Sequence, residues 1–180
     1  MPQTPVISIR PALASDNLLL CELGRQTFFD TFANENSPED MRAYLAQAFS
    51  PEKQAAELAD PDTQFVIAEI EGQPAGYARL RAGQPAKPFN CLNPLEIVRF
   101  YACKEWLGRG VGPALMQACL DAAQRGGFDL LWLDVWERNP RAIAFYHKWG
   151  FKVVGMQVFQ LGSDSQTDLL MKRHILSAAV

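Results

Sequence analysis

The sequence contains no long apolar run, no export signal and no excess of basic residues. No stretch approaches the about 18 consecutive apolar residues that cross a bilayer, and the opening MPQTPVISIR lacks a basic start followed by an apolar run. We therefore expect a cytoplasmic protein that does not enter a membrane. Because 17 basic residues stand against 20 acidic ones, giving a net charge of −3, we expect no general affinity for nucleic acid. A cationic small molecule suits this charge better.

Cysteine and histidine are also scarce. Two histidines and no CxxC pair are present, so neither a zinc site nor a disulfide framework is indicated, and we expect no bound metal. The four widely spaced cysteines are expected to be free thiols: Cys21, Cys91, Cys103 and Cys119. The chain does contain 48% hydrophobic residues over 180 positions. This content is enough for one domain, spanning residues 1–180, with a sizeable core.

The hydrophobic patterns predict an ordered series of strands and helices. Strands are expected at residues 6–10, 65–70, 74–80, 95–102, 130–136, 151–159 and 167–173. Helices are expected from Ser15 or Asp16 to about Thr27, at residues 37–50, from Pro51 onward for a short stretch, and at 110–125 and 141–148. Turns at 71–73 and 161–164 and a proline-rich loop at 81–94 connect them. This order predicts an α/β (α+β) fold with helices flanking a mixed sheet.

Three glycines within five positions precede the predicted helix at 110–125. They belong to the segment WLGRGVG, residues 106–112. Backbone N–H groups of such a loop and of a helix N-terminus can bind phosphate, but a tight connection explains the glycines equally well. The loop is not a Walker A motif. It is not GxGxxG either, because Pro113 takes the place of the third glycine, which argues against a Rossmann-type NAD-binding protein.

Two longer segments give this loop a context. LEIVRFYACKEWLGRGVGPALM at residues 95–116, followed by VWERNPRAIAFYHKWGF at 135–151, resembles the GNAT superfamily of acetyl-CoA-dependent N-acetyltransferases. The resemblance implies the GNAT fold, with a mixed and mostly antiparallel central sheet. QTFFDTFANENSPEDMRAYLAQAF and GSDSQTDLLMKR extend the likeness over nearly the whole chain to the PaiA-type branch. That branch implies acetylation of spermidine or spermine, and pairing of two chains in a homodimer.

The resemblance also implies which residues bind acetyl-CoA. The loop whose N–H groups bind the pyrophosphate corresponds to Leu107, Gly108, Arg109, Gly110, Val111 and Gly112. Leu107 stands where the family usually has Gln or Arg, which removes a side-chain contact but no N–H group, and Arg109 offers a replacement charge. The strand segment whose backbone is implied to pair with the pantetheine arm is Phe100, Tyr101 and Ala102. Asn139 is expected to cap the helix that follows it and to contact the cofactor, with Tyr146 beside the sulfur.

Tyr146 and Glu96 are the candidate catalytic residues. The resemblance implies that Tyr146 is the general acid, since its phenol is protonated at neutral pH and can return a proton to a thiolate. An ordinary core or surface aromatic residue is the alternative. Glu96 matches the position of the base in histone-acetylating members, and period-two alternation places it on the same face as Phe100; a solvated or arginine-paired glutamate is the alternative. PaiA-type proteins are expected to carry a second acid two residues later, where this chain has Val98.

The acceptor site is expected beside the N-terminal helices. Aromatic residues there are expected to shape the edge of the pocket and to pack the core elsewhere: Phe28, Phe29, Phe32, Tyr44 and Phe49. Four acids either make the cleft negative or are solvated surface charges: Asp30, Glu35, Asp134 and Glu137. We therefore predict an N-acetyltransferase that moves an acetyl group from acetyl-CoA to a primary amine by direct attack in a ternary complex. A polyamine is the first-choice acceptor. Another small amine, a protein N-terminus, or a non-catalytic acyl-CoA sensor are the alternatives.

Overall fold

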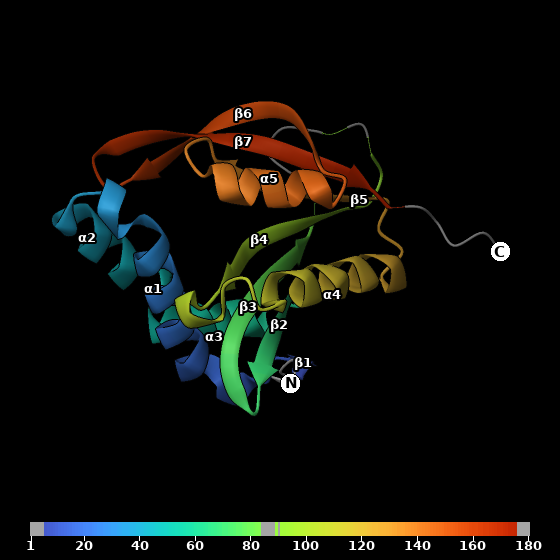
Figure 1. The fold of residues 1–180 in the computed structure, drawn as a ribbon, viewed down its shortest axis with the longest axis horizontal. Helices are drawn as coiled ribbons and strands as arrows, with labels where there is room; N and C mark the ends of the chain where they lie inside the picture. Colours follow the sequence, from blue (N-terminus) through green and yellow to red (C-terminus); the bar gives the residue numbers. More distant parts are fainter. Residues whose placement is uncertain (1–5, 84–88, 90, 176–180) are drawn as a thin grey trace.

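Seven strands form one sheet in the computed structural model, which describes residues 6–83, 89 and 91–175 (Figure 1). The spatial order is β1-β2-β3-β4-β5-β7-β6, and neighbouring strands are antiparallel except for the parallel pair β4 and β5. The strands are β1 (Ile7–Pro11), β2 (Thr63–Ile70), β3 (Gln73–Ala82), β4 (Pro94–Ala102), β5 (Leu130–Trp136), β6 (Lys152–Leu161) and β7 (Asp164–His174). The predicted mixed, mostly antiparallel sheet is therefore confirmed.

Helices cover both faces of this sheet. They are α1 (Asn17–Phe32), α2 (Pro38–Ala48), α3 (Pro51–Ala59), α4 (Val111–Arg125) and α5 (Pro140–Lys148). On β2, Val66 packs into the core under α4 and α5, whereas its neighbour Ile67 packs against α1 on the opposite face. Helix α2 lies against β6 at the far end of the sheet (Figure 1). Within the described residues, no helix is long and apolar enough to cross a membrane.

Capping residues fix the starts of several helices as the sequence indicates. The Oγ atoms of Ser37 and Ser50 each accept a hydrogen bond of 3.1 Å from the N–H three residues later, and a proline takes the first helical position after each. Asp16 takes the N-cap position of α1 as expected, but its side chain makes no capping hydrogen bond. Its carboxylate instead accepts the N–H of Leu13 and forms an ion pair with Arg10.

The predicted order of elements is confirmed, and the differences lie at element ends. Helix α1 continues to Phe32 rather than ending near Thr27. Strand β3 includes Ala82 and β4 begins at Pro94, so both ends of the predicted loop at 81–94 belong to strands. Residues 84–88 and 90 of that loop, and residues 1–5 of the N-terminal segment, lie outside the described part of the chain. All four cysteines are free, as expected.

The parallel strands β4 and β5 pair over a short distance and then separate. Pro94–Glu96 lies opposite Leu130–Trp132, and the described residues form no further pairs between these strands. On its other side, β4 stays paired with β3 as far as Ala102. One edge of β4 beyond Glu96 therefore has no strand partner. The sheet opens there as a fork between β4 and β5.

Candidate active site

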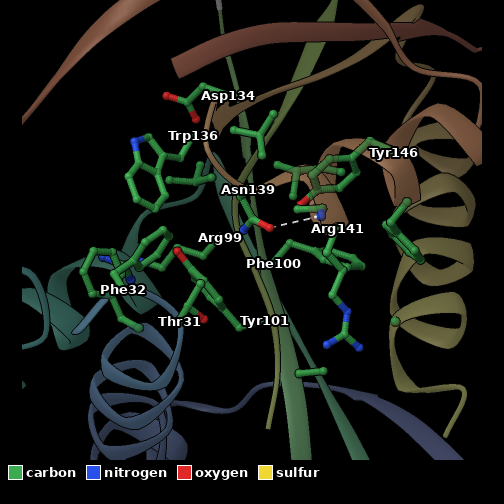
Figure 2. A pocket seen from close by; sticks show the side chains of 18 of the residues that line it. Thr31, Phe32, Arg99, Phe100, Tyr101, Asp134, Trp136, Asn139, Arg141 and Tyr146 are labelled. Carbon is green, nitrogen blue, oxygen red and sulfur yellow. Dashed lines mark hydrogen bonds between the residues drawn. The ribbon is translucent and has the colours of Figure 1, made fainter. Parts of the chain in front are cut away.

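A cavity of about 1000 Å³ follows the fork from the glycine loop to the helices α1 and α2. Figure 2 shows Tyr146 and Asn139 on one side of β4 and Phe32 of α1 on the other, with Asp134 and Trp136 of β5 beside the opening. The cavity therefore connects the predicted cofactor residues with the predicted acceptor helices.

The glycine loop presents free backbone donors at one end of this cavity. The N–H groups of Gly108, Gly110, Val111 and Gly112 bond to no described residue. Gly108 and Gly110 have φ values of +78° and +93°, a backbone conformation that glycine adopts readily. A Cβ built on Gly108 would meet nothing within 4 Å, so the space beside the loop is open. Several free N–H groups at the N-terminus of α4 suit an anionic group such as a pyrophosphate.

The side chains of the loop contribute less than its backbone. Leu107, Gly108, Gly110 and Gly112 line the cavity, but Arg109 and Val111 do not. The guanidinium of Arg109 stacks 5.3 Å from the centre of the Trp106 ring, and the side chain of Val111 is buried in the core. The replacement charge expected from Arg109 is therefore directed at Trp106 rather than into the cavity.

The unpaired edge of β4 passes through the middle of the cavity. Phe100, Tyr101 and Ala102 all line it, and no described strand pairs with their edge on the β5 side. The ring of Phe100 lies 6.0 Å from that of Tyr146 on the α5 side, whereas Tyr101 faces away, 6.4 Å from Phe28 of α1. This segment therefore offers a backbone edge to an extended ligand, with α4 and α5 on one face and α1 and α2 on the other.

Helix α5 presents two of the predicted residues to the fork. The Oδ1 atom of Asn139 accepts the N–H of Ala142 at 3.1 Å, which confirms the cap and leaves its amide group on the cavity wall (Figure 2). Tyr146 is 7% exposed, lines the cavity and forms no hydrogen bond to a described residue. Burial raises the pKa of the Tyr146 phenol, and the nearby Cys119 and Asp134 raise it further. The phenol is therefore protonated at neutral pH and able to donate.

A bulge at Val98 changes the face on which Glu96 lies. Val98 has no opposite residue on β3, and as a result Ile97 and Phe100 pack into the same core cluster under α4 and α5. Simple alternation, which placed Glu96 on the face of Phe100, is therefore wrong. Glu96 shares the opposite face with Tyr101, where the cavity meets α1 and α2.

Two carboxylates flank the fork on this acceptor face. Glu96 is 8% exposed and accepts a hydrogen bond of 3.0 Å from Nε of Arg81. Burial raises the pKa of Glu96; Arg81 lowers it, and Asp134 raises it. On β5, Asp134 accepts a 2.6 Å hydrogen bond from Gln157 of β6, and burial raises its pKa as well. Ion pairing with an arginine, the alternative for Glu96, is thus present, yet the pKa of Glu96 is raised overall because burial outweighs Arg81.

The end of the cavity beside α1 and α2, where the acceptor is predicted, is walled by aromatic rings. Of the five predicted aromatic residues, four line it, Phe28, Phe32, Tyr44 and Phe49, and Phe29 is exposed elsewhere. Of the four predicted acids, Asp30 and Asp134 line it, while Glu35 and Glu137 do not. The prediction missed Asp168 of β7, which also lines the cavity. Asp168 stands in the mostly polar strand DSQTDLLMKRH together with Asp164, so no pattern in the sequence singles it out.

The sequence model of the acetyltransferase (GNAT) family matches residues 25–151, a span that includes the fork, the glycine loop and α5. The chain belongs to this family. It is accordingly an N-acetyltransferase, and GNAT relatives span almost its whole length. An uncharacterised N-acetyltransferase in the pepI 3′ region of Lactobacillus delbrueckii subsp. lactis is 36% identical over 86% of this chain and 89% of the relative.

Two of the matches come from Thermoplasma acidophilum. A spermidine N(1)-acetyltransferase is 25% identical over 82% of this chain and 89% of that protein. The crystal structure of a PaiA N-acetyltransferase in complex with coenzyme A has a TM-score of 0.77 at 24% identity, covering 94% of this chain and 99% of that one. The predicted GNAT fold is therefore confirmed.

Proposed function

We propose that this GNAT enzyme transfers the acetyl group of acetyl-CoA to a primary amine of a small cationic acceptor by direct attack in a ternary complex. A polyamine is the first candidate for this acceptor. The arrangement at the fork carries the proposal. The buried phenol of Tyr146, which has no hydrogen-bond partner in the described part of the chain, lies on one face, and the carboxylates of Glu96 and Asp134 lie on the other. An acid for the leaving thiolate and a base for the ammonium are then on opposite sides of one opening.

The free N–H groups of the glycine loop would bind the pyrophosphate, and the unpaired edge of β4 at Phe100–Ala102 would pair with the pantetheine arm. Asn139, with an amide group on the cavity wall, would add a side-chain contact. Acetyl-CoA then supplies the activated acetyl group at the fork. The loop binds through its backbone, so Leu107 does not prevent binding.

In the proposed reaction, Glu96 takes a proton from the acceptor ammonium, directly or through one water. The freed nitrogen attacks the thioester carbonyl, so that an N–C bond forms and the C–S bond breaks. Tyr146 donates its phenolic proton to the departing sulfur. The second proton, which the nitrogen loses as the amide forms, restores the phenol of Tyr146, directly or through water. Asp134, whose pKa is also raised by burial, is the second candidate for the base. Comparing kcat in Asp134→Asn with kcat in Glu96→Gln distinguishes between these two candidates.

A cationic acceptor is supported by what surrounds the acceptor end. Aromatic faces and buried carboxylates together attract ammonium groups. PaiA-type proteins are expected to carry a second acid where this chain has Val98. Here two aspartates from other strands, Asp134 and Asp168, supply carboxylates to the cavity instead. The spermidine N(1)-acetyltransferase relative points to the same class of acceptor.

Turnover of acetyl-CoA with a panel of amines tests this proposal. The panel contains spermidine, a peptide with a free N-terminus and a simple alkylamine, and release of free thiol is measured. We expect spermidine to give the highest kcat/KM. Turnover of the peptide but not of spermidine would replace the polyamine with a protein N-terminus, and binding of acetyl-CoA without turnover of any amine would favour an acyl-CoA sensor.

We also propose that two chains form a homodimer through β6. This strand is at the edge of the sheet, and its Met156 and Val158 are exposed apolar residues. Light scattering coupled to size-exclusion chromatography tests the proposal, which a monomer at micromolar concentration would contradict. Cytoplasmic location stays a prediction.

A further inference from the structure

Asp168 lies at the centre of the acceptor wall. In the strand register it is opposite Trp136 of β5 on one side and Gln157 of β6 on the other. Directly opposite residues share a face of the sheet, and Figure 2 shows Trp136 directed into the cavity beside Phe32. Asp168 itself lines the cavity. Its carboxylate is therefore directed into the acceptor space and not toward the outside of the sheet.

The carboxylate of Asp168 has no partner within the described residues. It is 8% exposed, yet it accepts no hydrogen bond and meets no basic side chain there. Two buried glutamates also line the cavity, and each forms an ion pair: Glu57 with two arginines and Glu96 with Arg81. Burial is the main cause that raises the pKa of Asp168, and with the smaller contributions of the Asp134 and Glu137 charges this pKa is about 7. An isolated buried carboxylate of this kind is costly unless a cation is supplied by a ligand.

Aromatic rings surround this carboxylate from the other elements. The ring of Trp136 lies 5.9 Å from Phe32 of α1, and the ring of Phe159 lies 5.7 Å from Tyr44 of α2. Burial raises the pKa of Tyr44, and the charge of Asp168 contributes to raising it, so the two groups are close enough to interact. No three acidic, histidine or cysteine side chains among the described residues could hold a metal ion. The surroundings therefore fit an organic cation.

We infer that Asp168 binds a second ammonium group of the acceptor and so selects diamines and polyamines over monoamines. The inference rests on the proposed function, since the first nitrogen is the one that reacts at the fork. The register gives the span between the two groups. Glu96 is opposite Trp132 and Asp168 is opposite Trp136, on the two sides of β5. The two residues are therefore four positions, about 13 Å, apart along β5 and two strand spacings, about 10 Å, apart across the sheet. A separation of this size favours an extended acceptor that carries ammonium groups near its two ends.

Steady-state kinetics with matched acceptors test the inference. Each α,ω-diaminoalkane of a length series is compared with the n-alkylamine of the same chain length, in the wild type and in Asp168→Asn. We expect the wild type to prefer the longer diamines by about 10- to 100-fold in kcat/KM, the range expected for one charge-assisted hydrogen bond. Asp168→Asn should lose this preference through a higher KM for the diamine, with kcat and the monoamine parameters almost unchanged.

The control is Glu137→Gln, which removes an exposed charge that acts on Asp168 but does not line the cavity. It should keep the diamine preference. An equal loss for both acceptors in Asp168→Asn, or a retained preference, would overturn the inference while leaving the acetyltransferase proposal intact. If the wild type acetylated no amine, the proposed function would fail, and calorimetric titration of diamines into wild type and Asp168→Asn would still decide the subsite: tighter binding to the wild type supports it and equal binding refutes it.

Discussion

Gly108 and Gly72 have almost the same backbone conformation in different surroundings. Their φ values are +78° and +76°, and at neither position would a Cβ meet a heavy atom within 4 Å. Alanine in the left-handed region costs about 1–2 kcal/mol, so Gly108→Ala and Gly72→Ala should lower the free energy of unfolding by similar amounts. Gly108 lines the cavity and belongs to the donor loop, whereas Gly72 lies in the turn between β2 and β3.

The two variants should therefore differ in coenzyme A binding. A methyl group at Gly108 occupies the space that the pyrophosphate would take and displaces it from the N–H donors. Loss of one charge-assisted hydrogen bond, about 1.5–3 kcal/mol, corresponds to roughly 10- to 100-fold weaker binding. Calorimetric titration with coenzyme A measures the Kd, and urea unfolding measures stability. Equal Kd values for the two variants would refute the assignment of the pyrophosphate to this loop.

Three further predictions concern the fork and the acceptor wall. Tyr146→Phe should lower kcat by about 10²–10⁴-fold, the usual contribution of a general acid, with an unchanged Kd for coenzyme A; an unchanged kcat would exclude Tyr146 as the acid. Arg81 lowers the pKa of Glu96, so Arg81→Leu should move the acid limb of the kcat/KM profile to higher pH, and an unmoved limb would argue against Glu96 as the base. The pKa of Asp168 is raised to about 7 in the folded protein, so its ionisation destabilises the fold as pH rises from about 4 to about 7. The melting temperature of Asp168→Asn relative to wild type should therefore be higher at pH 8 than at pH 5, and a pH-independent difference would contradict the raised pKa.

The sequence predicts those features that depend on neighbouring residues in the chain. Caps such as Ser37 and Asn139, each followed by proline, define helix starts locally, which explains why the element order is confirmed. The GNAT motifs likewise lie within continuous segments. Asp16 shows the limit of this reasoning, because its carboxylate bonds to Arg10 of β1 and to a preceding N–H instead of capping α1.

The features that the sequence does not predict depend on pairing between distant strands. The face of Glu96 is set by the bulge at Val98, which exists only in the register between β3 and β4. The role inferred for Asp168 depends on β7 lying between β5 and β6, an order that differs from the order along the chain.

Transfer of a labelled acetyl group tests the central claim most directly. The protein is incubated with isotopically labelled acetyl-CoA and spermidine, and both the amine and the intact protein are analysed by mass spectrometry, with Tyr146→Phe in parallel. Direct attack in a ternary complex predicts labelled N-acetylspermidine, an unmodified protein, and strongly reduced product with the variant. Label on the protein itself, or labelled free acetate without acetylated amine, would contradict the account.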